Sequence, residues 1–288
     1  MRPCFAIEII TPQKYKLPGL WFGPAKAKRA IVFTHGLAGS AFGQLSLAEP
    51  WADKNTSVIT FSNRGHDKVS KLYRIANTKK GYTSTMAGEA HEVFTDCVDD
   101  IQGAIDFAKK KGIKEIYLAG HSTGCQKSVY YASKKADRAV KGLILLAPMS
   151  DYAAMVMLTK KEVLAKATQT ARAMMKAGKK HELIPTTIWH EGIDAQRFLS
   201  LYTPESVEEI FSYAQPKKIP ATLEKIKLPV LVVLGENDEF GDRPVKDIAA
   251  WFEKHINAKK EVKIVPKVMH IFTGGESQVA SMIRGWLK

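Results

Sequence analysis

The stretch "YLAGHSTGCQ", residues 117–126, places one serine between two glycines directly after a short apolar run. The run "EIYLAG" has the composition of a buried strand, and a helical pattern, "TGCQKSVYYASKKA", begins directly after Ser122. A strand, a sharp turn and a helix form the setting of a nucleophile elbow, whereas G-x-S-x-G without that setting is a weak signal. The sequence therefore predicts that Ser122 is a nucleophile.

Further apolar runs alternate with helical patterns along the chain. "AIVFTHG", "SVITFSNRG", "GLILLAP" and "PVLVVLGEND" each end in a Gly, Asn, Ser or Pro loop, as strands buried on both faces do. "FAIEII" and the segment around "GLWFG" indicate an opening antiparallel pair, and "EVKIVPK" indicates a last strand. This alternation predicts an α/β fold with a doubly wound, mostly parallel sheet, whose ligands bind at the carboxyl ends of the strands.

Residues 151–220 contain no convincing strand, although they separate two strand patterns. Thr159 and Glu162 form a capping-box pattern before a long helix, and Pro204 is well placed to begin a second, short helix. Long insertions in compact domains usually have a function. We therefore expect a core at 1–150 and 221–288 and a helical lid at 151–220. The alternative is that residues 151–220 form a peripheral helical segment that covers no part of the core.

A serine hydroxyl needs a neighbouring base that removes its proton, and eight histidines compete for this role. His270, in "VMHIFTG", follows the last strand pattern and comes after the serine and the acid, which is the chain order of α/β-hydrolases. His66, on a loop at a strand end, is the rival. His121 is expected to point to the side opposite its neighbour Ser122 and to be packed. We predict His270 as the base.

The acid that orients the imidazole should follow the run "PVLVVLG". Asp238 stands at the expected distance, and Glu236, Glu239 and Asp242 are its rivals. Two backbone donors must stabilise the oxyanion, and we expect them to be the N–H groups of Thr123 and of Leu37 in "VFTHGLAGS". His35, in the same loop, is expected to shape the loop by hydrogen bonding and to transfer no proton.

The composition excludes several other classes of protein. The three cysteines are widely spaced, which favours a reducing, cytoplasmic setting over a disulfide framework, and no histidine or cysteine spacing indicates a metal site. No glycine-rich phosphate loop is present, so no cofactor is expected. The apolar runs are too short to span a membrane. The net charge of +14 is spread along the chain, so we expect a solvated basic surface and no nucleic-acid partner.

Taken together, "VFTHGLAGS", "FSNRGH", "LAGHSTG", "VLGENDE" and "MHIF" resemble the α/β-hydrolase superfamily over nearly the whole chain. A narrower likeness, carried by "GHSTGCQ", "LLAPMSDYAAM", "AQRFLSL" and "FSY", is to a little-studied family that includes fungal esterases cleaving siderophore esters. The resemblance implies a triad of Ser122, Asp238 and His270. It does not carry the siderophore substrate over, because nothing in the chain points to a hydroxamate ligand.

The predicted function is that of a serine hydrolase that cleaves a small carboxylic ester through an acyl-enzyme, with a preference for short-chain aryl or acyl esters. Amide, peptide or thioester hydrolysis and acyl transfer are alternatives on the same triad. A non-catalytic small-molecule receptor and a basic nucleic-acid-binding protein are the alternatives of another class. An aspartate nucleophile, as in dehalogenases, is disfavoured because Ser122 occupies the elbow. The sequence leaves the oligomeric state open.

Overall fold

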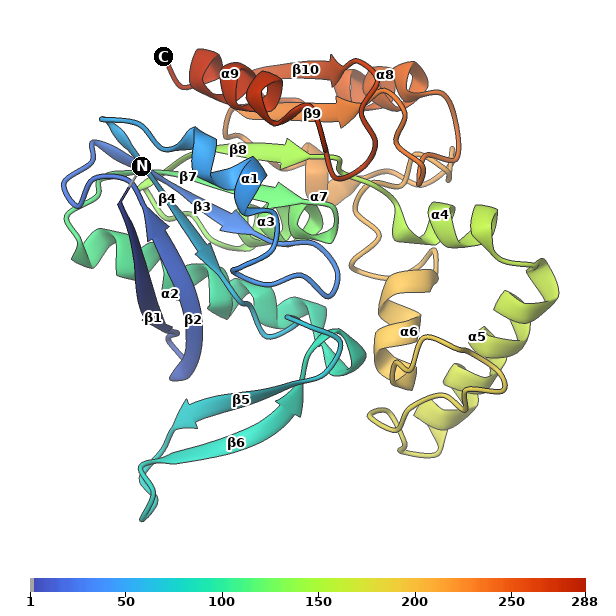
Figure 1. Ribbon diagram of the computed structural model, residues 1–288. Coiled ribbons are helices and arrows are strands. Elements are labelled where there is room, and N and C mark those ends of the chain that lie inside the picture. Colours follow the sequence, from blue (N-terminus) through green and yellow to red (C-terminus); the bar gives the residue numbers. More distant parts are fainter. Residues whose placement is uncertain (1–2) are drawn as a thin grey trace.

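The computed structural model describes residues 3–288, and one ten-stranded sheet runs through them (Figure 1). The order is β10-β9-β8-β7-β3-β4-β2-β5-β6, and β1 pairs with β2 beside this path. Neighbours from β10 to β4 are parallel, which confirms the doubly wound, mostly parallel sheet, and the opening pair β1–β2 is antiparallel as expected. The strands are β1 (Cys4–Ile10), β2 (Tyr15–Phe22), β3 (Arg29–Thr34), β4 (Thr56–Phe61), β5 (Ser70–Ile75), β6 (Tyr82–Ala87), β7 (Glu115–His121), β8 (Val140–Leu146), β9 (Val230–Gly235) and β10 (Lys260–Val265).

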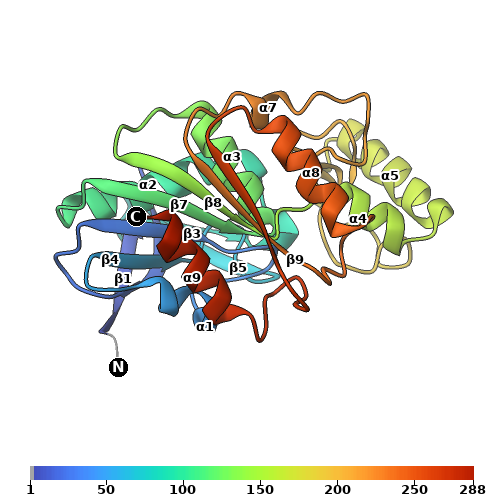
Figure 2. The same cartoon turned by 90° about the horizontal axis from the view of Figure 1, so that it is seen from above.

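Helices cover both faces of the sheet (Figure 2). Val32 of β3 packs into the apolar cluster beneath α2, α3 and α8, whereas its neighbours Ile31 and Phe33 pack into the cluster beneath α1 and α9. Because side chains alternate along a strand, a strand covered on both faces must be apolar throughout. The helices are α1 (Leu45–Ala48), α2 (Cys97–Lys110), α3 (Thr123–Lys134), α7 (Ala221–Glu224), α8 (Val245–His255) and α9 (Glu276–Trp286), with short 3₁₀ turns at η1 (Glu49–Trp51), η2 (Glu89–His91) and η3 (Phe94–Asp96).

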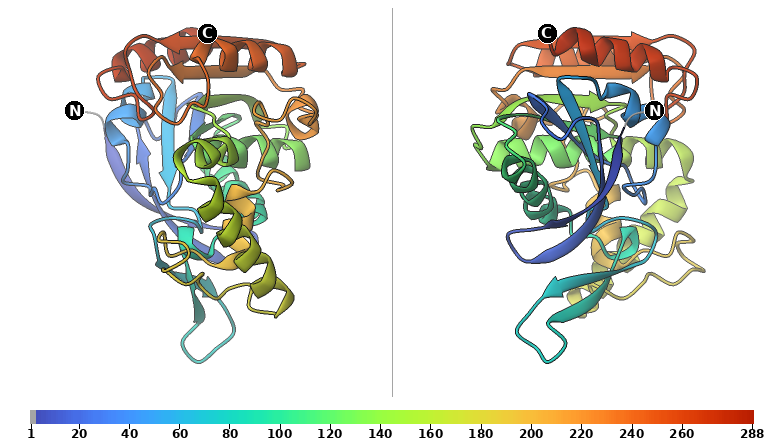
Figure 3. Two further views of the ribbon diagram at one scale, coloured as in Figure 1. Left: turned by 90° about the vertical axis from the view of Figure 1, so that its right-hand side faces the viewer. Right: turned by 60° about the vertical axis from the view of Figure 1, so that its left-hand side comes forward.

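The segment between β8 and β9 is helical and lies to one side of the sheet (Figures 1 and 3). It holds α4 (Asp151–Leu158), α5 (Lys161–Lys176) and α6 (Ala195–Tyr202). These helices share an apolar cluster of their own, in which Trp189 and Phe198 are fully buried. The division into a core and a lid stays a prediction.

Two details predicted for this segment are wrong. Lys160, not Thr159, precedes α5, and the hydroxyl of Thr159 contacts Met155 Sδ at 2.9 Å instead of capping the helix. No helix begins at Pro204, because α6 ends at Tyr202 and Thr203 is extended. A residue before proline is driven out of the helical region, so Pro204 marks the end of a helix here.

The hairpin of β5 and β6 was not predicted from the sequence, and it extends beyond the body of the molecule (Figures 1 and 3). Tyr73, Ile75, Tyr82 and Met86 are exposed, and Tyr73 and Tyr82 meet edge to face. The sequence does not show the strand pattern here, because most side chains on both strands are exposed. The residues therefore do not alternate between apolar and polar.

A buried ion cluster joins the 151–220 segment to the rest of the molecule. Glu92 contacts Lys127 Nζ at 2.5 Å and Arg197 Nη2 at 2.7 Å, and Arg197 Nη1 contacts Glu208 at 2.5 Å. All four side chains are at most 5% exposed. Burial by itself raises the pKa of Glu92, but Lys127 and Arg197 outweigh it and lower this pKa to about 2. Glu92 therefore stays ionised although it is buried.

Replacing Arg197 with methionine should destabilise the protein, because Glu92 and Glu208 would lose their shared cation while remaining buried. The expected loss in the free energy of unfolding is about 3–5 kcal/mol, the usual loss when one partner of a buried ion pair is removed. Urea unfolding measures it. The control is Arg172→Met at the exposed pair with Glu205, for which the loss should stay below about 1 kcal/mol. Equal losses in the two variants would contradict the prediction.

Candidate active site

Ser122 occupies a sharp turn between the end of β7 and the first residue of α3. Its backbone has φ 54° and ψ −126°, a positive φ that costs energy for any residue other than glycine. A Cβ on Gly120 would lie 2.2 Å from the carbonyl oxygen of Gly124, and a Cβ on Gly124 would lie 2.1 Å from that of Thr34. The predicted elbow geometry thus requires glycine at both positions.

Substituting Gly124 with alanine should destabilise the protein by about 3 kcal/mol or more, because the new methyl group meets rigid backbone of β3. Thermal and urea unfolding would measure this loss. Gly285→Ala is the matched control, because a Cβ at this position in α9 meets nothing within 4 Å. That helix-interior change should be neutral or stabilising by up to about 1 kcal/mol. A Gly124→Ala protein as stable as the control would show that the elbow is not closely packed.

A cavity of about 410 Å³ opens beside Ser122 at the carboxyl ends of the strands, the edge at which ligands are expected to bind. Its walls come from the loop after β3, the turn at the end of β7, the loops after β8, β9 and β10, and the 151–220 segment. Its lining residues are His35, Gly36, Leu37, Gly39, Ser40, Gly43, Gln44, His121, Ser122, Met149, Asp151, Ala154, Met155, Leu158, Glu191, Tyr202, Phe240, His270 and Ile271.

His270 and Asp238 form a hydrogen-bonded pair at this cavity. His270 Nδ1 lies 2.8 Å from Asp238 Oδ2, and the two side chains are 5% and 13% exposed. A carboxylate only accepts, so Nδ1 carries the hydrogen and Nε2 is left to act as a base. The rival carboxylates are engaged elsewhere. Glu239 accepts the backbone N–H of His270, Glu236 that of Lys267, and Asp242 pairs with the neighbouring Arg243.

Ser122 and His270 line the same cavity, but within residues 3–288 no hydrogen bond joins them. The hydroxyl of Ser122 lies 3.6 Å from Met149 Sδ instead. Catalytic hydrogen bonds are often long or misaligned before substrate binds, so this geometry is compatible with proton transfer. The complete triad stays a prediction.

His121 lines the same cavity, which contradicts the expectation that it points to the side opposite Ser122, but it is buried, as expected of a packed side chain. Its Nε2 lies 2.9 Å from the carbonyl oxygen of His270, and its Nδ1 lies 3.0 Å from Gln44 Nε2. Because a carbonyl only accepts, Nε2 carries the hydrogen and Nδ1 accepts from Gln44. Burial, helped by the charge of His270, lowers the pKa of His121 to about 3. His121 is therefore neutral, and it holds the backbone of His270 in place.

The remaining histidines near the strand ends do not compete as the base. His35 donates from Nδ1 to the carbonyl of Gly36 at 2.8 Å and accepts the N–H of Asn63 at 3.2 Å, so it shapes the loop as expected. Burial, with the charge of Lys127, lowers the pKa of His35 to about 3. His66 contacts the carbonyl of Asn63 at 2.7 Å and does not line the cavity.

The two backbone amides expected to form the oxyanion hole lie on segments that touch each other. A Cβ on Gly36 would lie 3.0 Å from Ser122 Cβ, so the loop after β3 packs on the elbow. Thr123 begins α3, where the N–H has no partner within the helix. The N–H of Leu37 also has no hydrogen-bond partner within residues 3–288. Both amides are therefore free to bind an oxyanion, the role that stays predicted for them.

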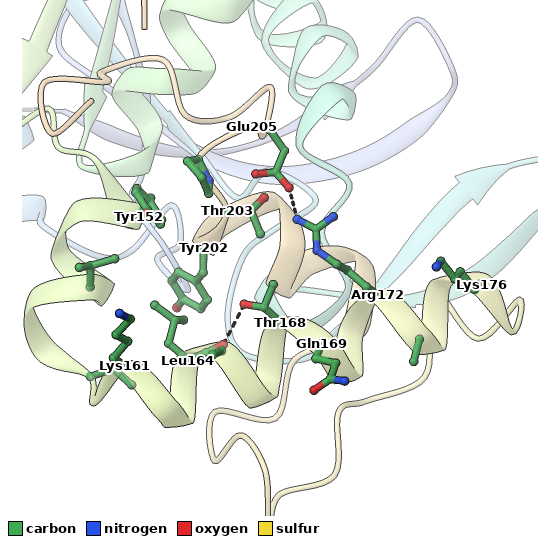
Figure 4. Close-up of a pocket in the computed structure, with 15 residues that line it drawn as sticks. Tyr152, Lys161, Leu164, Thr168, Gln169, Arg172, Lys176, Tyr202, Thr203 and Glu205 are labelled. Atoms are coloured by element: carbon green, nitrogen blue, oxygen red, sulfur yellow. Dashed lines mark hydrogen bonds and ion pairs between the residues drawn. The ribbon is translucent and has the colours of Figure 1, made fainter. Parts of the chain in front are cut away.

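A second, larger cavity of about 900 Å³ lies between α4, α5 and the segment 202–205 (Figure 4). Arg172 of α5 pairs with Glu205 across it, and Thr168 is hydrogen-bonded to the carbonyl of Leu164 in its own helix. None of Ser122, Asp238 and His270 lines it, but Tyr202 lines both cavities. Two of the three predicted catalytic residues, Ser122 and His270, therefore line the smaller cavity and not the larger one.

Over residues 3–288, no three histidine, cysteine, aspartate or glutamate side chains are grouped so that they could hold a metal ion. Within the same residues, every helix is too short or too polar to cross a bilayer.

Comparison with known proteins identifies the fold. A family model described as "Protein of unknown function (DUF1749)" matches residues 79–286. DcsB, solved with a substrate analogue, has a TM-score of 0.67 at 16% identity over 98% of both chains. Est1E from Butyrivibrio proteoclasticus, solved with ferulic acid, has a TM-score of 0.63 at 18% identity over 98% of both chains. An esterase from Pyrococcus furiosus has a TM-score of 0.59 at 17% identity over 99% of this chain and 91% of its own.

No curated protein matches the sequence significantly. The identities to the solved structures are low, so these likenesses show a shared fold. The narrower likeness to fungal siderophore esterases stays a prediction.

Proposed function

The chain belongs to the DUF1749 family and has the α/β-hydrolase fold, and from this premise we propose that it is a serine hydrolase acting on a small carboxylic ester. Ser122 would be the nucleophile, His270 the base and Asp238 its partner. The observation that carries the proposal is that His270, whose Nδ1 lies 2.8 Å from Asp238 Oδ2, lines one cavity together with a serine held at positive φ.

In this mechanism, His270 Nε2 takes the proton of Ser122 Oγ while Oγ bonds to the carbonyl carbon of the substrate. The N–H groups of Leu37 and Thr123 donate to the oxyanion of the tetrahedral intermediate, a contribution of about 3 kcal/mol for each donor. The protonated imidazole then gives its proton to the departing alcohol, which leaves an acyl-enzyme. A water molecule deprotonated by His270 releases the acid and restores Ser122.

Similar proteins support an ester as the substrate. The solved structures with the same fold include an esterase from Pyrococcus furiosus and two carboxylesterases from Bacillus subtilis. The cavity beside Ser122, at about 410 Å³, matches a small acyl or aryl group. We propose that short-chain esters are preferred.

The test combines a fluorophosphonate probe with a panel of p-nitrophenyl esters from acetate to palmitate. We expect the probe to label Ser122 and the short esters to be hydrolysed fastest. Matched amides and thioesters in the same assay separate esterase activity from the alternatives on the same triad. Turnover of the long chains alone would contradict the proposed preference, and absence of both labelling and turnover would favour a receptor.

A further inference from the structure

The carboxylic acids that line the cavity beside Ser122 are not accompanied there by lysine or arginine. Apart from histidines, the charged groups among its lining residues are Asp151 and Glu191, and neither lysine nor arginine is among them. The chain as a whole has 43 lysines and arginines against 29 aspartates and glutamates. An acidic lining in a basic protein is therefore a local property of this cavity, and it disfavours an anionic ligand.

Glu191 is held in place by two hydrogen bonds that meet on one oxygen. Its Oε2 accepts from Trp189 Nε1 at 3.1 Å and from the hydroxyl of Tyr202 at 2.8 Å. Within residues 3–288 its Oε1 accepts no hydrogen bond. The carboxylate is thus oriented by neutral donors, and no lysine or arginine among the described residues forms an ion pair with it. One of its oxygens is left for a ligand.

Asp151 supplies a second carboxyl group to the same wall. The residue is 8% exposed, and its Oδ2 accepts from Gln126 Nε2 at 2.7 Å. No described residue donates to its Oδ1. Burial, together with Glu208, raises the pKa of Asp151 well above its ordinary value, because a charged carboxylate is poorly solvated there.

The wall that carries Asp151 is otherwise apolar. Asp151, Ala154, Met155 and Leu158 of α4 all line the cavity, and their spacing places them on one side of that helix. A ligand lying along α4 would meet an apolar surface that is flanked by the carboxyl groups of Asp151 and Glu191. The lining therefore suits a molecule with an apolar body and a cationic group.

We infer that the substrate is an ester that carries a positively charged nitrogen and that Glu191 binds this charge while the ester carbonyl lies at Ser122. The inference rests on the proposed function, because it assigns a substrate class to the same cavity. It extends that function, because neither the fold nor the triad chemistry requires a charged substrate.

The test uses pairs of esters that differ only in charge. Choline butyrate is compared with the analogue in which carbon replaces nitrogen, so that tert-butyl replaces trimethylammonium in the alcohol. The p-nitrophenyl ester of γ-trimethylammoniobutyrate and its tert-butyl analogue make the same comparison in the acyl group. In at least one pair, kcat/KM should favour the cationic ester by about tenfold, the size of one partly desolvated charge contact. Equal rates within both pairs would overturn the inference.

Glu191→Gln removes the charge and keeps an acceptor for Trp189 and Tyr202, and it should abolish most of the preference for the cationic ester. The control is Glu182→Gln, an exposed carboxylate on the same segment that pairs with Lys179 at 3.1 Å and does not line the cavity. The control should keep the wild-type preference. A preference that survives in Glu191→Gln, or that falls equally in both variants, would overturn the assignment to Glu191.

Binding separates this inference from the proposed function. Titration of the Ser122→Ala protein with each pair of esters gives two dissociation constants without requiring turnover. Tighter binding of the cationic member supports the inference even if no ester is hydrolysed by the wild type, in which case the hydrolase proposal alone fails. Equal dissociation constants contradict the inference even if the wild type proves to be an active esterase.

Discussion

Replacing Ser122 with alanine is expected to lower kcat for ester hydrolysis by about 10⁵-fold or more, the scale seen when a catalytic nucleophile is removed. The reason is that the acyl-enzyme cannot form without Oγ, and the remaining groups offer only binding and oxyanion stabilisation. Turnover of the best p-nitrophenyl ester measures the change. Fluorophosphonate labelling should disappear in parallel, because the probe reacts with the same oxygen.

Ser133→Ala in the same helix is the matched control, because its hydroxyl only donates to the carbonyl of Tyr130 at 2.7 Å. This variant should be labelled and should hydrolyse esters like the wild type. Unfolding curves for both variants separate lost chemistry from lost folding. A folded Ser122→Ala protein with more than a small residual rate would show that another residue is the nucleophile.

Replacing Asp238 with asparagine should lower kcat by about 10⁴-fold, the scale of a mis-oriented catalytic histidine. The amide can donate a hydrogen bond to Nδ1 of His270, which favours the tautomer with the hydrogen on Nε2. That tautomer cannot take the proton of Ser122. KM should change little, because Asp238 is not among the residues that line the cavity. Steady-state kinetics separates the two constants.

The control for this prediction is Asp242→Asn, because Asp242 pairs with Arg243 at 2.7 Å and makes no hydrogen bond to His270. Its kcat should stay near the wild-type value. Slow labelling of Ser122 should persist in Asp238→Asn, because the nucleophile itself is intact. If the two variants lost similar activity, the loop as a whole, and not the orientation of His270, would be responsible.

Local patterns predicted most of the sheet correctly, because strands covered on both faces leave long apolar runs. The hairpin of β5 and β6 has no such cover and was missed for that reason. The helix ends in the 151–220 segment were also misplaced. There Thr159 contacts a methionine sulfur, and Pro204 follows the end of a helix. Both depend on how the segment packs, which a capping pattern in the sequence does not record.

In the candidate site, too, some residues could be predicted from local sequence patterns and others could not. Ser122, Asp238 and His270 stand at strand ends with recognisable spacing, so they could be selected without coordinates. Gln44, Glu191 and Tyr202 line the same cavity, but they come from loops and a helix end with no motif of their own. His121 was misjudged because the direction of a side chain at the end of a strand depends on the loops around it.

By itself, the sequence determined the α/β fold, the elbow at Ser122 and the order of the candidate catalytic residues, since these follow from local periodicity and from glycines that the turn requires. Only the tertiary structure decided which side chains share the cavity, which carboxylates Arg197 holds in the buried ion cluster and that the cavity wall is acidic. The physical reason is that these contacts join residues far apart in the chain. Their partners are chosen by packing and charge in three dimensions, which no local pattern records.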